Sequence, residues 1–206
     1  MPSRNVVKQY APESYYHIYN RGVNKQDIFK SDYDYKVFLN YLKRHLSKEP
    51  QTDKYGRQHP HFYSEIELLA FCLMPNHFHL LVYQAQNDKA ISKFLQSLST
   101  GYSMYFNKTH NRLGGLFQGT FRASRITRDE YLQHISRYIH LNPKKYTSYS
   151  WSSLPHYLGN RNTEWVRPKR ILELFKNSDD YLMYVKDYDD YKKSLGEIKY
   201  ELANSV

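Results

Sequence analysis

The chain has 206 residues, 40% of them hydrophobic, a formal net charge of +10 and a single cysteine, which suits one domain with an extension. Its longest apolar stretches, such as 68–74, are too short to span a membrane, and the first 16 residues lack the apolar segment of a secretory signal. We therefore expect a cytoplasmic protein without membrane contact, whose Cys72 is a buried core thiol rather than half of an internal disulfide.

Turn residues and apolar spacing divide the first part of the chain into short elements. Ser31 is a typical helix N-cap, followed by Asp32 and Asp34 in the first turn, and apolar residues then recur at helical spacing. Pro75-Asn76 marks a turn between two apolar runs. The expected elements are a strand at 15–23, a helix at 32–48, an exposed polar loop at 49–64, and strands at 66–74 and 77–84.

The second part of the chain continues with helices and one more strand. Thr127 and Glu130 have the spacing of a capping box, and Pro143 ends the helix that follows. The expected elements are a helix at 90–108, a strand at 116–126, a helix from the capping box to about 141, and two short helices at 169–175 and 179–195. The β-α-β-β-α-β order predicts an α+β, ferredoxin-like split antiparallel sheet with an added helix. We expect one domain at 1–148 and a helical extension at 149–206.

The sequence MPNHFHLLV contains two histidines one residue apart. Side chains at i and i+2 of a strand share a face, so His77 and His79 point the same way, while Phe78 and Leu80 point into the core. Two adjacent imidazoles form half of a metal site. A pair of surface histidines is the alternative, but core sequence on both sides favours a position in the middle of the sheet.

The sequence YIHLNP places Tyr138 one helical turn before Asn142, so the two side chains share a face. Such a helix could bring a hydroxyl nucleophile and an amide oxygen to the histidine pair, while Leu132, Ile135 and Ile139 pack on the sheet. Alternatively, Tyr138 is a packing aromatic and Asn142 only ends the helix. Because the chain has 22 tyrosines, position rather than residue type singles out Tyr138.

These motifs resemble the REP-associated tyrosine transposases, within the wider group of insertion-sequence-200-like HUH transposases. The motifs that carry the resemblance occur in family order over roughly residues 15–175: YHIYNRG with DIF, MPNHFHLLV, LFQGTFRA, RYIHLNP and YSWSSLPHYLG. The resemblance implies that His77, His79 and Asn142 bind a divalent metal, Mg²⁺ or Mn²⁺, and that Tyr138 is the nucleophile. It also implies a single-strand DNA endonuclease and strand transferase that acts on hairpin DNA through a 5′-phosphotyrosine intermediate, as a monomer or homodimer. The polar loop at 49–64 departs from the family pattern as an insertion, and the base that deprotonates Tyr138 stays open, with His134 one turn earlier as a candidate.

Nearly all of the excess positive charge lies between residues 89 and 162, where eleven Lys and Arg residues face only two acids, Asp129 and Glu130. Cations interleaved with aromatic residues are typical of surfaces for single-stranded nucleic acid. The candidate phosphate contacts are Arg21, Lys108, Arg112, Arg122 and Lys144. A non-catalytic single-stranded nucleic-acid-binding module on the same sheet is the main alternative, but it would carry exposed aromatics where this chain has histidines. A hydrolytic metallonuclease would need carboxylates to hold its metals, and the central region has almost none.

Overall fold

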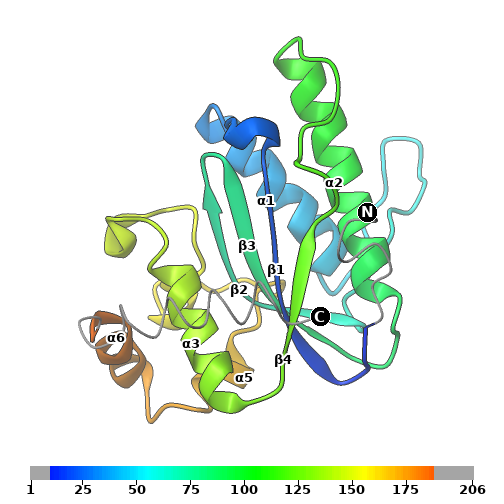
Figure 1. Ribbon diagram of the computed structural model, residues 1–206. Coiled ribbons are helices and arrows are strands. Elements are labelled where there is room, and N and C mark those ends of the chain that lie inside the picture. The colour runs from blue at the N-terminus through cyan, green and yellow to red at the C-terminus, as the bar shows by residue number, and fades with distance from the viewer. Residues whose placement is uncertain (1–9, 188–206) are drawn as a thin grey trace, which may run out of the picture.

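Four antiparallel strands form one sheet in the order β2-β3-β1-β4 in the computed structural model, which describes residues 10–187 (Figure 1). The strands are β1 (Ser14–Arg21), β2 (Ile66–Met74), β3 (His77–Gln84) and β4 (Arg122–Ile126). Helix α1 (Asp32–Leu46) connects β1 to β2, and α2 (Ala90–Thr109) connects β3 to β4. The predicted α+β fold with its β-α-β-β-α-β order is therefore confirmed.

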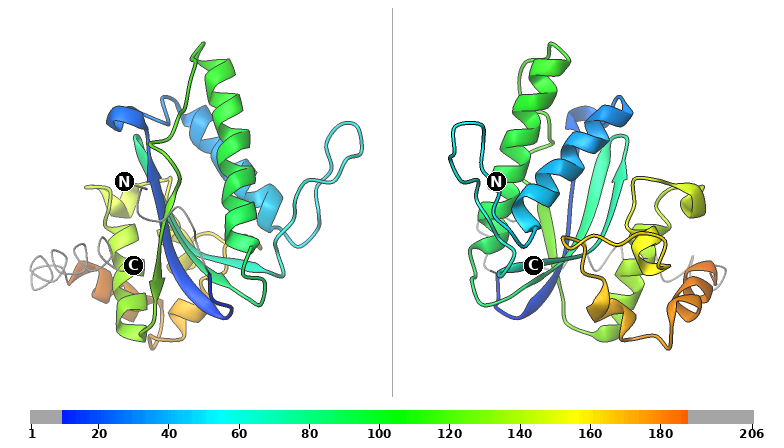
Figure 2. Two further views of the ribbon diagram at one scale, coloured as in Figure 1. Left: turned by 45° about the vertical axis from the view of Figure 1, so that its right-hand side comes forward. Right: turned by 180° about the vertical axis from the view of Figure 1, so that it is seen from behind.

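Helices cover both faces of the sheet, which gives the molecule three layers (Figure 2). Helices α1 and α2 pack on one face, where Phe78, Leu80 and Val82 of β3 are fully buried. Helix α3 (Asp129–His140) lies on the other face. Because side chains alternate along a strand, the histidines of β3 face α3.

The segment after residue 148 is built into the same body. A 3-10 turn, η1 (Val23–Lys25), follows β1, and a second, η2 (Tyr146–Ser148), follows α3. The chain then forms the short helices α4 (Leu154–Tyr157), α5 (Lys169–Leu172) and α6 (Ser178–Lys186). Ser152 and Ser153 lie along the edge strand β2, where Ser153 N donates to Phe71 O at 3.0 Å. Side chains of α4, α5 and α6 pack in the same hydrophobic cluster as those of α3, so these helices support α3 on the sheet. No helix among residues 10–187 is long and apolar enough to cross a membrane.

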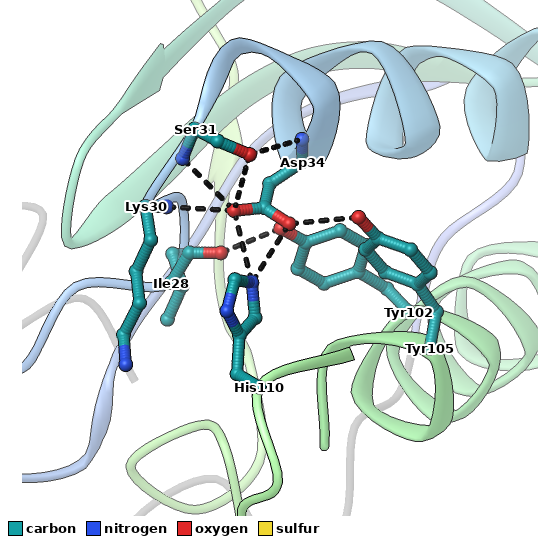
Figure 3. A network of polar contacts seen from close by, with 7 residues as sticks. All are labelled: Ile28, Lys30, Ser31, Asp34, Tyr102, Tyr105 and His110. Carbon is teal, nitrogen blue, oxygen red and sulfur yellow. Dashed lines mark hydrogen bonds and ion pairs between the residues drawn. The ribbon is translucent and has the colours of Figure 1, made fainter. Parts of the chain in front are cut away.

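The fully buried Asp34 ties the start of α1 to the end of α2 (Figure 3). Ser31 caps α1 as predicted, and the Asp34 carboxylate accepts from Lys30 N at 2.8 Å and from Ser31 N at 3.0 Å. The same carboxylate accepts from the Tyr105 hydroxyl at 2.8 Å and lies 3.0 Å from Nε2 of His110. Burial alone would raise the pKa of Asp34, but the hydrogen bonds from His110, Tyr105 and Lys30 outweigh it and lower that pKa. The network fixes the angle between the two helices of this layer.

Two local expectations were wrong, and one short helix was missed. The strand expected at 116–126 begins only at Arg122, because Gly119 turns the chain with a φ of 75°. The predicted capping box is absent: α3 starts at Asp129 with extended Arg128 as its N-cap, so Thr127 lies one residue too early. The short helix α4 was not predicted at all. Of the last expected helix, at 179–195, the structure has α6 to Lys186, and residues 188–195 lie outside the described residues.

Candidate active site

His77 and His79 lie side by side on the sheet face that α3 covers. In the antiparallel register, Arg21 of β1 is opposite His77 and Tyr19 is opposite His79. The two imidazole rings are arranged edge to face, with centroids 5.1 Å apart. His79 is buried, with 5% of its surface exposed, whereas His77 is partly exposed at the start of β3. The two imidazoles therefore share one face of the sheet.

Helix α3 brings Tyr138 and Asn142 to these histidines. Its buried face, with Leu132, Ile135 and Ile139, packs against the sheet and sets the distance. The Tyr138 ring stands edge-on to the His79 ring, with centroids 5.4 Å apart. Asn142 follows the helix end, and its Oδ1 lies 3.0 Å from Nε2 of His77. All four residues singled out in the sequence thus meet in one place.

The surroundings of His77 suit a divalent cation. Its Nδ1 lies 2.6 Å from Asn76 Oδ1 and its Nε2 lies 3.0 Å from Asn142 Oδ1. A neutral imidazole has only one N–H and cannot satisfy two carbonyl oxygens. Protonation is disfavoured, because burial, together with the charge of Arg21, lowers the pKa of His77 despite the Asn142 hydrogen bond. A cation held between Nε2 and Asn142 Oδ1 would remove this conflict, as would rotation of the Asn142 amide.

The three candidate donors, His77, His79 and Asn142, include no carboxylate. Among residues 10–187, no group of three or more His, Cys, Asp or Glu side chains could hold a metal ion. His77, His79 and Asn142 would supply only neutral donors to an ion, so its charge would stay almost uncompensated. Such an ion would attract an anionic phosphate more strongly than one surrounded by carboxylates.

Tyr138 is a protonated phenol near neutral pH. Burial raises its pKa, and the side-chain hydrogen bond with Asn142 offsets only part of that shift. His134, the candidate base, is half-buried, and its Nδ1 lies 2.6 Å from the Tyr184 hydroxyl of α6. This imidazole therefore faces the supporting helices, and the structure offers no geometric support for His134 as the base.

One residue of the site escaped the sequence analysis. His17 of β1 is 2% exposed, and its Nε2 lies 2.9 Å from Nδ1 of His79. Its ring also stands edge-on to the Tyr138 ring, with centroids 6.0 Å apart. The alternation of His17, Tyr19 and Arg21 in YHIYNR was the available signal, since these side chains share one strand face.

Buried polar side chains connect α3 to α6 and to the segment beside β2. His140 lies between α6 and β2: its Nδ1 is 2.6 Å from the Tyr181 hydroxyl, and its Nε2 is 2.8 Å from Ser153 Oγ. The Tyr181 hydroxyl also donates to Ser136 Oγ at 3.2 Å, and Ser153 Oγ accepts from Phe71 N at 2.8 Å. Burial lowers the pKa of His140 to about 3, so this imidazole is neutral. We call these four side chains, His140, Tyr181, Ser136 and Ser153, the α3 anchor.

Residues 11–142, which hold all four predicted site residues, match the family described as "Transposase IS200 like". The match spans more than half of the chain. The chain belongs to the IS200-like transposase family. It is therefore an enzyme of the transposase class, as the motif resemblance implied. Comparison with curated proteins found no match.

Solved structures share the fold of this transposase. A REP-associated tyrosine transposase bound to a REP hairpin is 15% identical, with a TM-score of 0.54 over 79% of this chain and 91% of that one. A candidate transposase from Deinococcus radiodurans is 16% identical, with a TM-score of 0.38 over 68% of this chain and 95% of that one. The first similarity supports the fold assignment.

The cations predicted to contact DNA lie in different settings of the transposase. Arg21 and Arg122 are exposed beside the histidine pair and line a pocket with Tyr19, Asn20 and Gln118. Lys144 is exposed two residues after Asn142. Lys108 is exposed in the last turn of α2, which extends beyond the sheet (Figure 1). The Arg112 guanidinium instead donates to Asn107 and to the carbonyls of Gly114 and Gly115, so it fastens the loop after α2.

The structure also bears on the alternative of a binding module. Such a module stacks bases on an open sheet face. In this transposase α3 covers the face that carries His79, and α1 with α2 covers the other. Together with family membership, this arrangement favours the enzyme.

Proposed function

We propose that this transposase cleaves and rejoins single-stranded DNA next to a hairpin, with Tyr138 as the nucleophile and a divalent metal held by His77, His79 and Asn142. The observation that carries the proposal is the placement of the Tyr138 ring against His79, with Asn142 3.0 Å from His77. The hairpin is proposed because the REP-associated transposase with the same fold is bound to one.

In the first step, the Tyr138 oxygen attacks the phosphorus of the scissile phosphate. The phenol loses its proton, the bond from phosphorus to the 3′ oxygen breaks, and the departing oxygen becomes a 3′ hydroxyl. The product is a 5′-phosphotyrosine. Since the ester bond is conserved rather than hydrolysed, attack by a different 3′ hydroxyl reverses the step and joins new strands.

The side chains of the site align the nucleophile, the metal and the DNA phosphates. Mg²⁺ or Mn²⁺, when bound, would polarise a phosphate oxygen and offset its negative charge. Tyr138 lies in the last turn of α3 and Asn142 directly after its C-cap, so the position of the nucleophile is coupled to that of the proposed metal ligand. Arg21 and Arg122 provide positive charge beside the histidines and suit the flanking phosphates.

Covalent capture tests the proposal. The protein is incubated with Mn²⁺ and a labelled pool of hairpins whose single-stranded flanks are randomised, and adducts are resolved on a denaturing gel. We expect a labelled band that mass spectrometry maps to the peptide containing Tyr138. Tyr138→Phe should abolish the band while folding and DNA binding persist. Tyr131→Phe, two turns earlier on α3, is the matched control and should keep the band.

An adduct that persists in Tyr138→Phe would refute the assignment of the nucleophile. Absence of any adduct from the whole pool, with DNA binding intact, would favour the non-catalytic binding module.

A further inference from the structure

His17 contacts both partners of the proposed chemistry without belonging to the predicted ligand set. Its ring lies nearly parallel to that of His79, with an interplanar angle of 16° and centroids 5.1 Å apart. The Nε2 of His17 and the Nδ1 of His79 are separated by 2.9 Å, a hydrogen-bond distance. Both residues are buried, so water does not compete for this bond.

A histidine that binds a metal through one nitrogen carries its proton on the other, and that N–H needs an acceptor to hold the ring in place. With Nδ1 of His79 directed at His17, coordination by His79 uses Nε2. The Nδ1–H of His79 then donates to Nε2 of His17, which must present a lone pair. A neutral imidazole whose proton is on Nδ1 can accept at this nitrogen.

We propose that His17 is a positioning residue that accepts a hydrogen bond from His79 and thereby directs Nε2 of His79 toward the metal. This inference rests on the metal site of the proposed function. Carboxylates and backbone carbonyls are the common acceptors for metal-bound histidines. Here a third imidazole takes that place, and it adds no negative charge to a site that must receive a phosphate.

The same ring touches the nucleophile. His17 packs edge-on against Tyr138, and Tyr138 packs edge-on against His79. The three rings therefore form one cluster, in which His17 supports the metal ligand and the nucleophile at once. A shift of His17 would change the separation between the ion and the attacking oxygen.

Metal binding without DNA tests the inference apart from catalysis. Mn²⁺ affinity is measured by electron paramagnetic resonance of free Mn²⁺, and the visible spectrum of bound Co²⁺ reports ligand geometry. His17→Phe keeps a flat ring but cannot accept, and we expect 10- to 100-fold weaker Mn²⁺ binding with an altered Co²⁺ spectrum. In His17→Gln the amide oxygen can reach the position of Nε2, so affinity should return to within about threefold of the unmodified protein.

Two further variants separate positioning from folding. His45→Phe removes another buried histidine, whose Nδ1 contacts Pro60 O on the opposite side of the sheet, and should leave Mn²⁺ affinity unchanged. His17→Asn keeps a polar amide that is too short to reach His79. If His17→Phe does not fold, the contrast between the Asn and Gln variants carries the test.

The outcomes distinguish the two proposals. Equal Mn²⁺ affinity in the unmodified protein and in His17→Phe, or in the folded Asn and Gln variants, would overturn the role of His17 and leave the metal site standing. Equally weak binding by the Gln and Phe variants would also overturn it, because His17 would then be a ligand itself or a packing residue. No Mn²⁺ binding by the unmodified protein and by His45→Phe would overturn the metal site of the proposed function, and this inference with it.

Discussion

Removal of the Tyr181 hydroxyl should slow DNA cleavage although Tyr181 lies outside the catalytic cluster. Tyr181 is fully buried, and its hydroxyl lies 2.6 Å from His140 Nδ1 and donates to Ser136 Oγ at 3.2 Å. Tyr181→Phe leaves the His140 N–H without its acceptor and removes a donor from Ser136. A buried polar group left unpaired costs about 1–3 kcal/mol, so we expect a loss of about 2–3 kcal/mol in unfolding free energy.

Tyr181→Phe should slow DNA cleavage more than it weakens DNA binding. His140 is two residues from Tyr138 and two from Asn142, so movement of this turn displaces the nucleophile and a metal ligand together. A misplacement of about 1 Å can cost about 100-fold in rate. We expect Tyr181→Phe to form the covalent adduct about 10- to 100-fold more slowly, with DNA affinity unchanged within about threefold.

The assay combines single-turnover adduct formation, fluorescence anisotropy for DNA affinity and denaturant unfolding. Tyr157→Phe is the matched control, because Tyr157 is equally buried in the same core but its hydroxyl donates to Leu69 O of β2 at 3.0 Å rather than to α3. Tyr157→Phe should lose about as much unfolding free energy as Tyr181→Phe but cleave DNA at the rate of the unmodified protein. Equal rates in Tyr181→Phe and the unmodified protein, or equal slowing in both variants, would refute the proposed coupling.

Three other predictions concern salt, metal and acid. If about six phosphates are neutralised, the logarithm of DNA affinity should fall with the logarithm of salt concentration with a slope near −4, at roughly −0.7 per contact; a flat response would remove the case for a basic DNA surface. EDTA, His77→Ala and His79→Ala should each abolish adduct formation and leave DNA binding largely intact, and full cleavage in EDTA would exclude the metal. Burial lowers the pKa of His140 to about 3 and those of His45 and His156 to about 4. These values lie below the unfolded value of about 6.5, so the unfolded chain binds protons first and the stability present above pH 6.5 is lost as the pH falls toward 4. At pH 5.5 the three together should cost on the order of 4 kcal/mol relative to pH 7.5, which denaturant unfolding at the two pH values would measure; equal stability would contradict their burial as neutral groups.

Sequence patterns were informative for residues that lie only a few positions apart in one strand or helix. The alternation of His77, Phe78 and His79 placed the imidazoles on one strand face, and the turn between Tyr138 and Asn142 placed them together on one helix end. The structure brings these two motifs together. Their proposed roles remain predictions that the experiments above address.

Features that depend on contacts distant in sequence were not predictable in this way. His17 lies 62 residues before His79, and only the pairing of β1 with β3 makes them neighbours. The same applies to His140, whose partners Ser153 and Tyr181 lie 13 and 41 residues further along the chain. At the start of α3, a good capping pattern at Thr127 was overridden because the strand before it continues to Ile126 and the helix begins at Asp129.

The α3 anchor also limits how two copies of this chain could share their catalytic parts. If α3 alone moved to a second subunit, His140 and Ser136 would lose the partners supplied by Tyr181 and Ser153. Arg137 would lose its bonds to the carbonyls of Tyr184 and Asp187. Each of these buried groups would cost about 1–3 kcal/mol if left unpaired, so α3 can act in a second subunit only where that subunit supplies the same partners. A linker that permits such an exchange must lie before Asp129, and the short connection from β4 offers only Thr127 and Arg128 for it.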